Sequence, residues 1–396
     1  MDVCISGCNR PGVLRVSQLS SPPNLPRSTY VHVPFCRHRC GYCNFTLIAG
    51  RDDLIPAYLE ALSIELSHLD IPLPMDTIFL GGGTPSHLSP AQLNQLFSMI
   101  HEAFPLRAGG EFSLEANPAD ISHEQVKLFA DAGVNRVSLG IQSFDDQKLA
   151  TLERDHRANT IFEATKIVAS QIDNLSLDLI FGVPGETRAT WQRDLQQAVA
   201  LAPQHISTYG LTYEPGTSFW NRRQKQQLSP LAEDDEAWMY ELAIDTLTAK
   251  GFKHYEVSNF AQQAYRSKHN QVYWTGAPYF AIGPGAARFV DGVREINHRS
   301  TTTYLKRVMA GQSPVAERET LTPEQLARER LVFGLRRMQG VDADQFATDT
   351  GFSIENLAGS VVDRCCEQGW LRWQSRRLQL TRSGLLLSDS LWPEFL

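Results

Sequence analysis

The feature that most constrains this chain is a regular alternation of short apolar runs with helical patterns, which begins near residue 29. The runs are rich in β-branched residues and lie at 29–34, 76–81, 111–116, 136–141, 175–181, 205–212 and 254–259. The helical patterns between them lie at 55–69, 89–104, 121–132, 158–172, 187–200 and 235–250. Such repetition is typical of a parallel β-sheet whose strands are joined by right-handed crossovers.

The number of strand–helix units limits the architecture further. Roughly six units are too few for the full eight-stranded barrel. We therefore expect an α/β fold built on an incomplete parallel (β/α) barrel. In closed barrels and open sheets alike, functional side chains gather at the C-terminal ends of the strands.

The chain changes character along its length, and four regions are expected. Residues 1–28, rich in Pro and Ser, form a poorly ordered arm, and the barrel occupies 29–290. Residues 291–320 are a linking region, and 321–396 form a winged-helix-like α+β domain. That domain combines two short strands around a Ser-Arg-Arg turn with helical patterns at 322–337, 342–349 and 353–368. A packing or docking role is favoured over DNA binding, because a fold alone does not imply a function.

The composition excludes several classes of protein. The 396 residues carry 37 Lys and Arg against 44 Asp and Glu, a net charge of −7. This balance gives no bulk basic surface and disfavours nucleic acid as a partner. No apolar stretch approaches the roughly 18 residues of a transmembrane helix. The N-terminus lacks the apolar core of a secretory signal, although its Ser-rich composition leaves an organelle-transit segment open.

Seven cysteines are the one anomaly in the composition, because they are clustered rather than spread. They are Cys4, Cys8, Cys36, Cys40, Cys43, Cys365 and Cys366. In a long chain, a tight cysteine cluster is typical of a reduced metal-binding protein and not of a disulfide scaffold. We therefore expect a cytoplasmic protein.

The central cluster has the spacing C-x3-C-x2-C, and it follows the first predicted strand directly. Three thiolates from Cys36, Cys40 and Cys43 can ligate three irons of a [4Fe–4S] cluster and leave the fourth iron open to a small molecule. The basic residues 37–39 between them favour thiolates and an anionic cluster. Zinc is the competing interpretation. It wants four ligands, no suitable second pair follows, and Cys4 and Cys8 lie in the proline-rich arm.

These residues resemble a known family. The string from Tyr30 to Cys43 is similar to the cluster loop of radical S-adenosylmethionine (SAM) enzymes, and the glycine loop Gly81–Pro85 follows the second strand as it does in that family. The resemblance covers nearly the whole chain from about residue 29. It is to the HemN/HemW branch, which resembles oxygen-independent coproporphyrinogen III oxidase, and most of all to the haem chaperones within it. It implies a [4Fe–4S] cluster on the three central cysteines, with bound SAM.

The resemblance also implies which residues contact SAM. The matching positions are Tyr30, Tyr42, Gly82, Gly83, Thr84, Glu115, Gln142, Arg154 and Asp178. Glycines in such a loop let the backbone approach a ligand closely. Glu115, Gln142 and Asp178 end or follow successive predicted strands, so we expect them to meet on one rim. Arg154 can pair with a carboxylate bidentately.

Two positions bear on the function within this branch. The dehydrogenase pattern resembles C-x3-C-x2-C-x-C, but Phe45 stands where its last cysteine would be. The string from His269 through Tyr273 to Trp274 resembles the H-N-x-x-Y-W signature associated with haem. A neutral imidazole ligates haem iron well, and aromatic rings suit a porphyrin face. A packed structural histidine is the alternative interpretation.

The leading hypothesis is therefore a haem chaperone that holds a cluster and SAM and carries haem as cargo to acceptor apoproteins, membrane-bound ones included. The alternative is an oxygen-independent coproporphyrinogen III dehydrogenase, which performs radical oxidative decarboxylation in porphyrin biosynthesis. A radical SAM enzyme acting on nucleic acid is a third and weaker option. Cleavage of SAM, the identity of the acceptor and homodimer formation are left open by the sequence.

Overall fold

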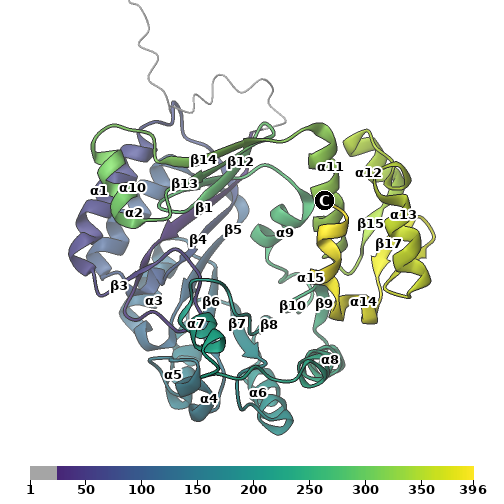
Figure 1. The fold of residues 1–396 in the computed structure, drawn as a ribbon. Helices are drawn as coiled ribbons and strands as arrows, with labels where there is room; N and C mark the ends of the chain where they lie inside the picture. Colours follow the sequence, from purple (N-terminus) through teal and green to yellow (C-terminus); the bar gives the residue numbers. More distant parts are fainter. Residues whose placement is uncertain (1–24) are drawn as a thin grey trace, which may run out of the picture.

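A computed structural model describes residues 25–396, so Cys4, Cys8 and most of the expected arm lie outside the described part. A nine-stranded sheet in the order β11-β1-β4-β5-β6-β7-β8-β10-β9 is strongly curved (Figure 1). Its parallel strands are β11 (Phe280–Ile282), β1 (Ser28–Val33), β4 (Met75–Gly82), β5 (Leu106–Ala116), β6 (Arg136–Gln142), β7 (Asn174–Phe181) and β8 (His205–Gly210). The expected incomplete parallel barrel is confirmed.

The last predicted strand is wrong in detail. The run 254–259 is not one parallel strand but spans the turn of a hairpin, β9 (Lys253–Glu256) and β10 (Asn259–Ala261). β10 runs antiparallel to β8. The chain reverses at Val257 and Ser258, where the Ser258 carbonyl accepts a hydrogen bond from the Thr208 amide at 2.8 Å. The edge strand β11 was missed, since three residues carry too little pattern to stand out.

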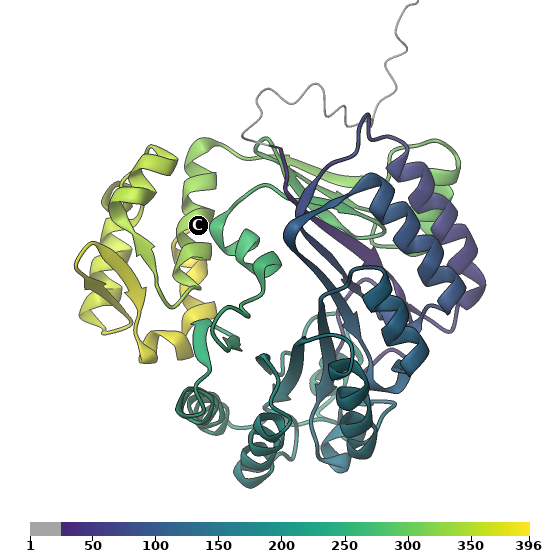
Figure 2. The same ribbon diagram turned by 180° about the vertical axis from the view of Figure 1, so that it is seen from behind.

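Helices cover the convex face of the sheet (Figures 1 and 2). They are α1 (Ile55–Leu66), α2 (Pro90–Ala103), α3 (His123–Asp131), α4 (Asp146–Thr151), α5 (Ala158–Ala169), α6 (Arg188–Ala200) and α8 (Glu233–Ala249). The short helix α7 (Ser218–Gln224) lies instead against the cysteine loop, where the Phe219 amide donates to the Gly41 carbonyl at 2.8 Å. α2 starts where the sequence predicts, because Ser89 and Gln92 form a capping box and Pro90 takes the first helical position. In β6, Val137 and Leu139 are fully buried in the hydrophobic core.

The concave face of the sheet is polar, which is unusual for a barrel interior. Because strand residues alternate between faces, Arg136 and Ser138 point away from the core-forming side of β6. Buried polar residues on the neighbouring strands include Thr77, Glu111, Ser113, Ser176, His205 and Ser207. Helix α9 (Lys268–Thr275) lies between the two ends of the sheet (Figure 2). The Glu111 carboxylate accepts hydrogen bonds from the first two backbone amides of α9, those of Lys268 at 2.9 Å and His269 at 3.0 Å. At this end of the helix the dipole favours an anion.

The range 291–320 is part of a second sheet. This antiparallel sheet consists of β12 (Ala287–Val290), β13 (Val293–Asn297) and β14 (Val315–Thr320). Helix α10 (Thr301–Met309) connects the last two strands and packs on α1. The region expected to link the two domains is thus folded against the barrel.

The C-terminal region combines helices with a small antiparallel sheet, as expected. Its elements are α11 (Pro323–Leu335), β15 (Val341–Asp342), α12 (Ala343–Thr350), α13 (Ile354–Glu367), β16 (Leu371–Gln374), β17 (Arg377–Leu380), α14 (Arg382–Leu386) and α15 (Ser388–Leu391). The sheet order is β15-β17-β16. Ser375 in the β16–β17 turn has a φ of 57°, so the predicted turn is a tight one.

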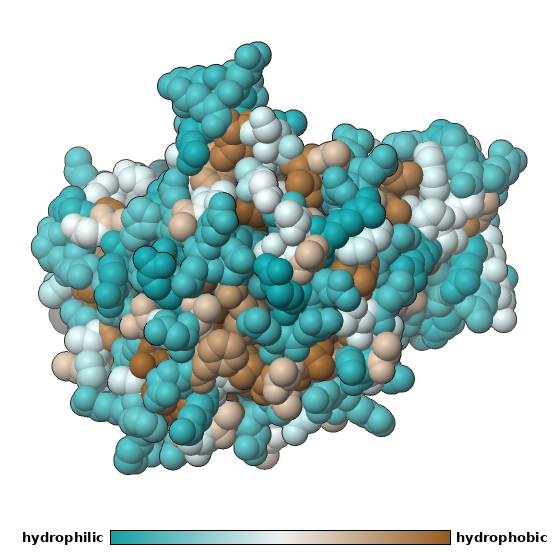
Figure 3. All heavy atoms as spheres, turned by 90° about the horizontal axis from the view of Figure 1, so that it is seen from below, coloured by the Kyte–Doolittle hydropathy of each residue, from teal (hydrophilic) through white to brown (hydrophobic). Residues whose placement is uncertain are grey.

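The surface seen from below is mainly hydrophilic, with apolar residues in small patches (Figure 3). Within residues 25–396, no helix combines the length and apolar character that crossing a bilayer requires.

A buried carboxylate joins the barrel to the second sheet. Glu65 on α1 accepts hydrogen bonds from the Gly283 amide at 3.0 Å, the Asn297 side chain at 2.8 Å and the Tyr304 hydroxyl at 2.5 Å. Burial raises the pKa of Glu65. These contacts fix the loop after β11, the end of β13 and the helix α10 to one side chain.

We predict that Glu65→Ala lowers the free energy of unfolding by at least about 3 kcal/mol, because three buried donors lose their acceptor at roughly 1–3 kcal/mol each. Glu60→Ala is the control, since Glu60 is exposed on the same helix and should change stability by no more than about 0.5 kcal/mol. Urea denaturation measures both. Equal effects of the two variants would contradict the role of Glu65.

Candidate functional site

A cavity of about 420 Å³ opens at the C-terminal ends of the parallel strands. The predicted residues that line it are Cys36, Cys40, Cys43, Tyr42, Gly82, Gly83, Thr84, Glu115, Gln142, Arg154 and Asp178. They come from the segment after β1, from the ends of β4, β5, β6 and β7, and, for Arg154, from the segment after α4. The structure therefore brings together every predicted cluster and SAM residue except Tyr30.

The cysteine loop is closed by its own short strands. β2 (Phe35–Cys36) pairs in parallel with β3 (Ile48–Ala49), and the Cys43 amide donates to the Cys40 carbonyl at 3.1 Å. Cys36 is buried, with its Sγ 3.1 Å from the Thr84 hydroxyl. Burial raises the pKa of Cys36 to about 12, and a bound metal would favour its thiolate form.

The donors of the cysteine loop are compatible with a cluster. Cys36, Cys40 and Cys43 all line the same cavity, and each thiolate of such a loop can bind a different iron of a [4Fe–4S] cluster. Among residues 25–396, no three His, Cys, Asp or Glu side chains are placed to hold one metal ion together.

The glycine loop serves a purpose that the sequence did not reveal. The Gly83 amide donates to the Val33 carbonyl at 2.7 Å and the Thr84 amide to the Phe35 carbonyl at 2.8 Å. A Cβ on Gly83 would meet the Phe35 carbonyl oxygen at 2.7 Å. The loop is therefore glycine-rich because it lies against the backbone of the cysteine loop, and these two amides are not free for a ligand.

Two half-buried carboxylates form the wall of the cavity next to this loop. Glu115 accepts from the Gly82 amide at 3.0 Å, and Asp178 accepts from the Ser138 hydroxyl at 2.8 Å. Burial raises the pKa of Glu115 to about 7 and also raises the pKa of Asp178. Both groups have oxygen atoms that can accept hydrogen bonds from hydroxyl or amino groups of a ligand.

Gln142, the last residue of β6, and Arg154, which follows α4, also line the cavity. Gln142 takes a left-handed conformation with a φ of 63°, which is strained for a residue with a side chain. Arg154 donates to the Gly140 carbonyl at 2.8 Å and lies 3.6 Å from the Cys40 sulfur. Its guanidinium therefore joins the cysteine loop to β6, a contact that the sequence did not predict.

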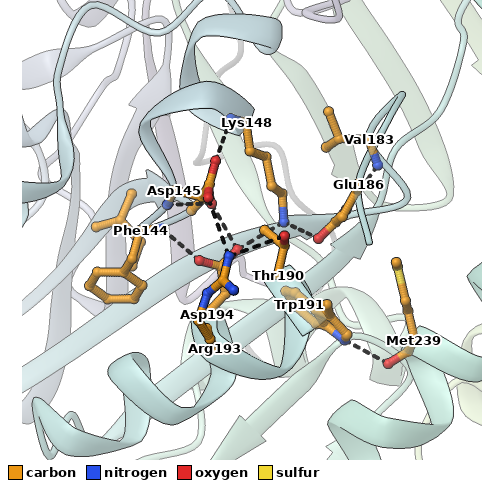
Figure 4. Close-up of polar contacts among 12 residues, drawn as sticks. Phe144, Asp145, Lys148, Val183, Glu186, Thr190, Trp191, Arg193, Asp194 and Met239 are labelled. Atoms are coloured by element: carbon orange, nitrogen blue, oxygen red, sulfur yellow. Dashed lines mark hydrogen bonds and ion pairs between the residues drawn. The ribbon is translucent and has the colours of Figure 1, made fainter. Parts of the chain in front are cut away.

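A buried ion cluster holds the loops that carry these residues (Figure 4). Lys148 on α4 lies between Glu186 and Asp194, at 2.5 Å and 3.0 Å, and all three side chains are nearly inaccessible. Asp194 also accepts from the Phe144 amide at 2.7 Å and from the Ser143 hydroxyl at 2.8 Å. Residues 143 and 144 follow Gln142 directly, so the cluster fixes the strained turn at the cavity.

Two predicted residues lie away from this cavity. Tyr30 points toward the barrel interior, where its hydroxyl is 3.1 Å from Nδ1 of His32 and its ring stacks on Phe79. His269 is buried on α9. Its Nδ1 is 2.8 Å from the Thr77 hydroxyl and its Nε2 2.8 Å from the Tyr273 hydroxyl. Neither residue lines the cavity that holds the cysteines.

A second cavity of about 640 Å³ lies between α9, the second sheet and α11. Tyr273 and Trp274 line it together with Phe289 and Phe333, and Arg294 and Arg330 are its basic residues. The indole nitrogen of Trp274 is buried and has no hydrogen-bond partner among the described residues. The residues of the His269–Trp274 motif therefore lie in two places. His269 is buried in the barrel interior, whereas the side chains of Tyr273 and Trp274 face this second cavity.

Sequence reasoning missed one group in the first cavity. Tyr209 lines it and remains 42% exposed, so its ring is available to a ligand. The signal was present, because Tyr209 falls near the end of the predicted strand 205–212, where functional side chains gather.

Comparison with known proteins identifies the family. The radical SAM superfamily matches residues 30–198, and the HemN C-terminal domain matches residues 321–387. A Bacillus subtilis protein named heme chaperone HemW is 36% identical over 375 residues, which cover 93% of this chain and 99% of that protein. The chain belongs to the radical SAM superfamily and to its HemW family.

Other relatives agree with this membership. The Danio rerio protein named radical S-adenosyl methionine domain-containing protein 1, mitochondrial, is 34% identical over 387 residues, covering 93% of this chain and 86% of that one. A solved structure of Escherichia coli coproporphyrinogen III oxidase (HemN), described as a radical SAM enzyme, has a TM-score of 0.83 and 21% identity. It covers 94% of this chain and 90% of that one, and it shows the shared fold. Radical SAM membership implies a [4Fe–4S] cluster and SAM in this HemW-family chain.

We predict that Lys148→Met lowers the free energy of unfolding by about 3–5 kcal/mol, because it leaves two buried carboxylates without their cation. Lys127→Met is the matched control, since the Lys127–Asp131 pair is largely exposed and such pairs contribute at most about 1 kcal/mol. Chemical denaturation of both variants tests this. A loss below about 1 kcal/mol for Lys148→Met would contradict the structural role of the ion cluster.

Proposed function

We propose that this chain is a haem chaperone that binds a [4Fe–4S] cluster and SAM in the first cavity and carries haem at the α9 end of the barrel. The observation that carries the proposal is relatedness over nearly the full chain to proteins named heme chaperones. The aromatic cavity beside Tyr273 and Trp274 supports it. Phe45, which stands in place of a further cysteine, argues against the dehydrogenase alternative.

In this proposal Cys36, Cys40 and Cys43 would hold the cluster, whose fourth iron would have no cysteine ligand and would be available to SAM. The cluster supplies electron-transfer chemistry to the SAM sulfonium when both are bound. Glu115 and Asp178 accept hydrogen bonds from SAM, and Gln142, Tyr42 and the carbonyl groups of Gly82–Thr84 complete the contacts. Arg154 positions Cys40, and Tyr30 acts indirectly through His32 and the wall of the barrel.

Haem, in this proposal, enters the second cavity as cargo. Tyr273 and Trp274 offer flat faces to the porphyrin, and Arg294 or Arg330 can pair with its propionates. Burial lowers the pKa of His269 to about 3, so the imidazole is neutral, as iron ligation requires. To reach the iron, Nε2 of His269 must exchange the Tyr273 hydroxyl for the metal. Haem is then passed to acceptor apoproteins.

The cluster is tested by iron content. We predict that anaerobically purified protein contains about four irons per chain and that changing Cys36, Cys40 and Cys43 to Ser removes them. A variant with Cys365→Ser and Cys366→Ser is the control, because these cysteines lie on α13, far along the chain from the cavity. Unchanged iron in the first variant, or loss of iron in the second, would assign the cluster to other ligands.

The haem function is tested by titration followed through the Soret band. We predict that His269→Ala binds haem about tenfold or more weakly, a loss of at least about 1.4 kcal/mol, and shifts the band. His101→Ala serves as control, since His101 is exposed on α2. An unchanged affinity and band in His269→Ala would remove this residue as the ligand. Absence of haem binding by the wild type would overturn the chaperone proposal itself.

A further inference from the structure

A chain of hydrogen bonds crosses the polar interior of the barrel from one end to the other. Asp178 accepts from the Ser176 hydroxyl at 3.4 Å, and Ser176 is 2.8 Å from Nδ1 of His205. Nε2 of His205 is 2.8 Å from the Tyr255 hydroxyl, which in turn accepts from the Ser267 amide at 3.3 Å. Three of these side chains are fully or almost fully buried.

The direction of this chain is fixed by its ends. The Ser267 amide can only donate, so the phenol oxygen of Tyr255 accepts from it. The phenol hydrogen then points to Nε2 of His205, which is its one acceptor among the described residues. Because burial holds the pKa of His205 far below its usual value, the ring is neutral and carries its proton on Nδ1. That proton goes to Ser176, whose own hydrogen goes to Asp178.

The two ends of the hydrogen-bond chain lie at the first cavity and at the N-terminus of α9. Asp178 lines the cavity of the cysteines. Ser267 is the N-cap of α9, where its hydroxyl accepts from the Asn270 amide at 3.2 Å. That helix carries His269, Tyr273 and Trp274. His205 and Tyr255 line neither cavity, and they connect the first cavity to the helix whose Tyr273 and Trp274 line the second.

We propose that His205 and Tyr255 are positioning residues that couple SAM at Asp178 to the N-terminus of α9, and thereby to haem. The inference rests on the proposed function. Hydroxyl and amino groups of SAM compete with Ser176 for the Asp178 oxygens. Since hydrogen bonds in a chain polarise one another, this competition weakens each following bond up to the Ser267 amide. SAM therefore loosens α9 and makes it easier for Nε2 of His269 to exchange its partner.

The coupling is reciprocal by thermodynamic necessity. SAM at saturation should tighten haem binding by about fivefold or more, and haem should tighten SAM binding by the same factor. The measurement uses the anaerobic full chain with its cluster and without reductant, so that SAM stays intact. Haem is titrated with and without SAM, and SAM with and without haem.

Tyr255→Phe tests the route, because it removes one hydroxyl and keeps the ring. Its haem affinity without SAM should rise toward that of the SAM-saturated wild type, because the Ser267 amide has lost its acceptor. The ratio of haem affinities with and without SAM should therefore fall to about one. Tyr240→Phe is the matched control, since this buried hydroxyl donates to the Val257 carbonyl at 2.6 Å, outside the chain. It should keep the wild-type ratio. Ser176→Ala interrupts the hydrogen-bond chain at another bond and should lower the ratio of haem affinities in the same way as Tyr255→Phe. It provides the same test if Tyr255→Phe does not fold.

Hydrogen exchange of the α9 amides provides a readout that needs no haem. SAM should speed exchange in residues 268–275 of the wild type and of Tyr240→Phe, and should leave Tyr255→Phe unchanged. If the wild type fails to bind haem but shows this pattern of exchange, the chaperone proposal is overturned. The coupling between SAM and α9 then still holds. Two results would overturn the inference. One is a wild type whose haem affinity and α9 exchange do not respond to SAM. The other is a response of wild-type size in both Tyr255→Phe and Ser176→Ala.

Discussion

The parallel pairing of β1 with β4 is the interaction on which the site depends. It continues beyond the strands, where Gly83 and Thr84 donate to the backbone carbonyls of Val33 and Phe35. These bonds place the cysteine loop against the glycine loop and bring Cys36 to the Thr84 hydroxyl. Only glycine at position 83 allows the two backbones to approach so closely. The cluster loop is thus held in place by the sheet and not only by the metal it would bind.

The rest of the barrel uses polar groups where most barrels use aliphatic ones. Carboxylates at Glu65, Glu111 and Asp194 each collect several donors from elements distant in sequence. Such buried networks stabilise one arrangement when every member is satisfied, and they are costly when one member is removed. In this fold they connect the loops of the first cavity, the second sheet and α9.

Much of this could be predicted from the sequence, because the relevant signals are local. Strand–helix alternation gave six of the parallel strands, and Ser89 with Pro90 marked the start of α2 correctly. The C-terminal ends of strands indicated that Glu115, Gln142 and Asp178 would meet. Arg154 was expected to bind a ligand carboxylate, but its contacts with Cys40 and Gly140 depend on a fold that spacing alone does not describe. The hairpin at 253–261 was missed because its turn residues are neither Gly nor Pro.

The sequence by itself determined the chemical types: three thiols on one loop, a glycine loop, carboxylates at strand ends, and an aromatic motif near residue 270. These follow from residue identity and periodicity, which are local properties. Only the tertiary structure decided how they are oriented. It placed His269 in the barrel interior and Tyr273 and Trp274 at a cavity, and it aligned Ser176, His205 and Tyr255 between two sites. Such placement depends on strand register and on the packing of α9 between the sheet ends, since contacts between distant segments leave no period in the sequence.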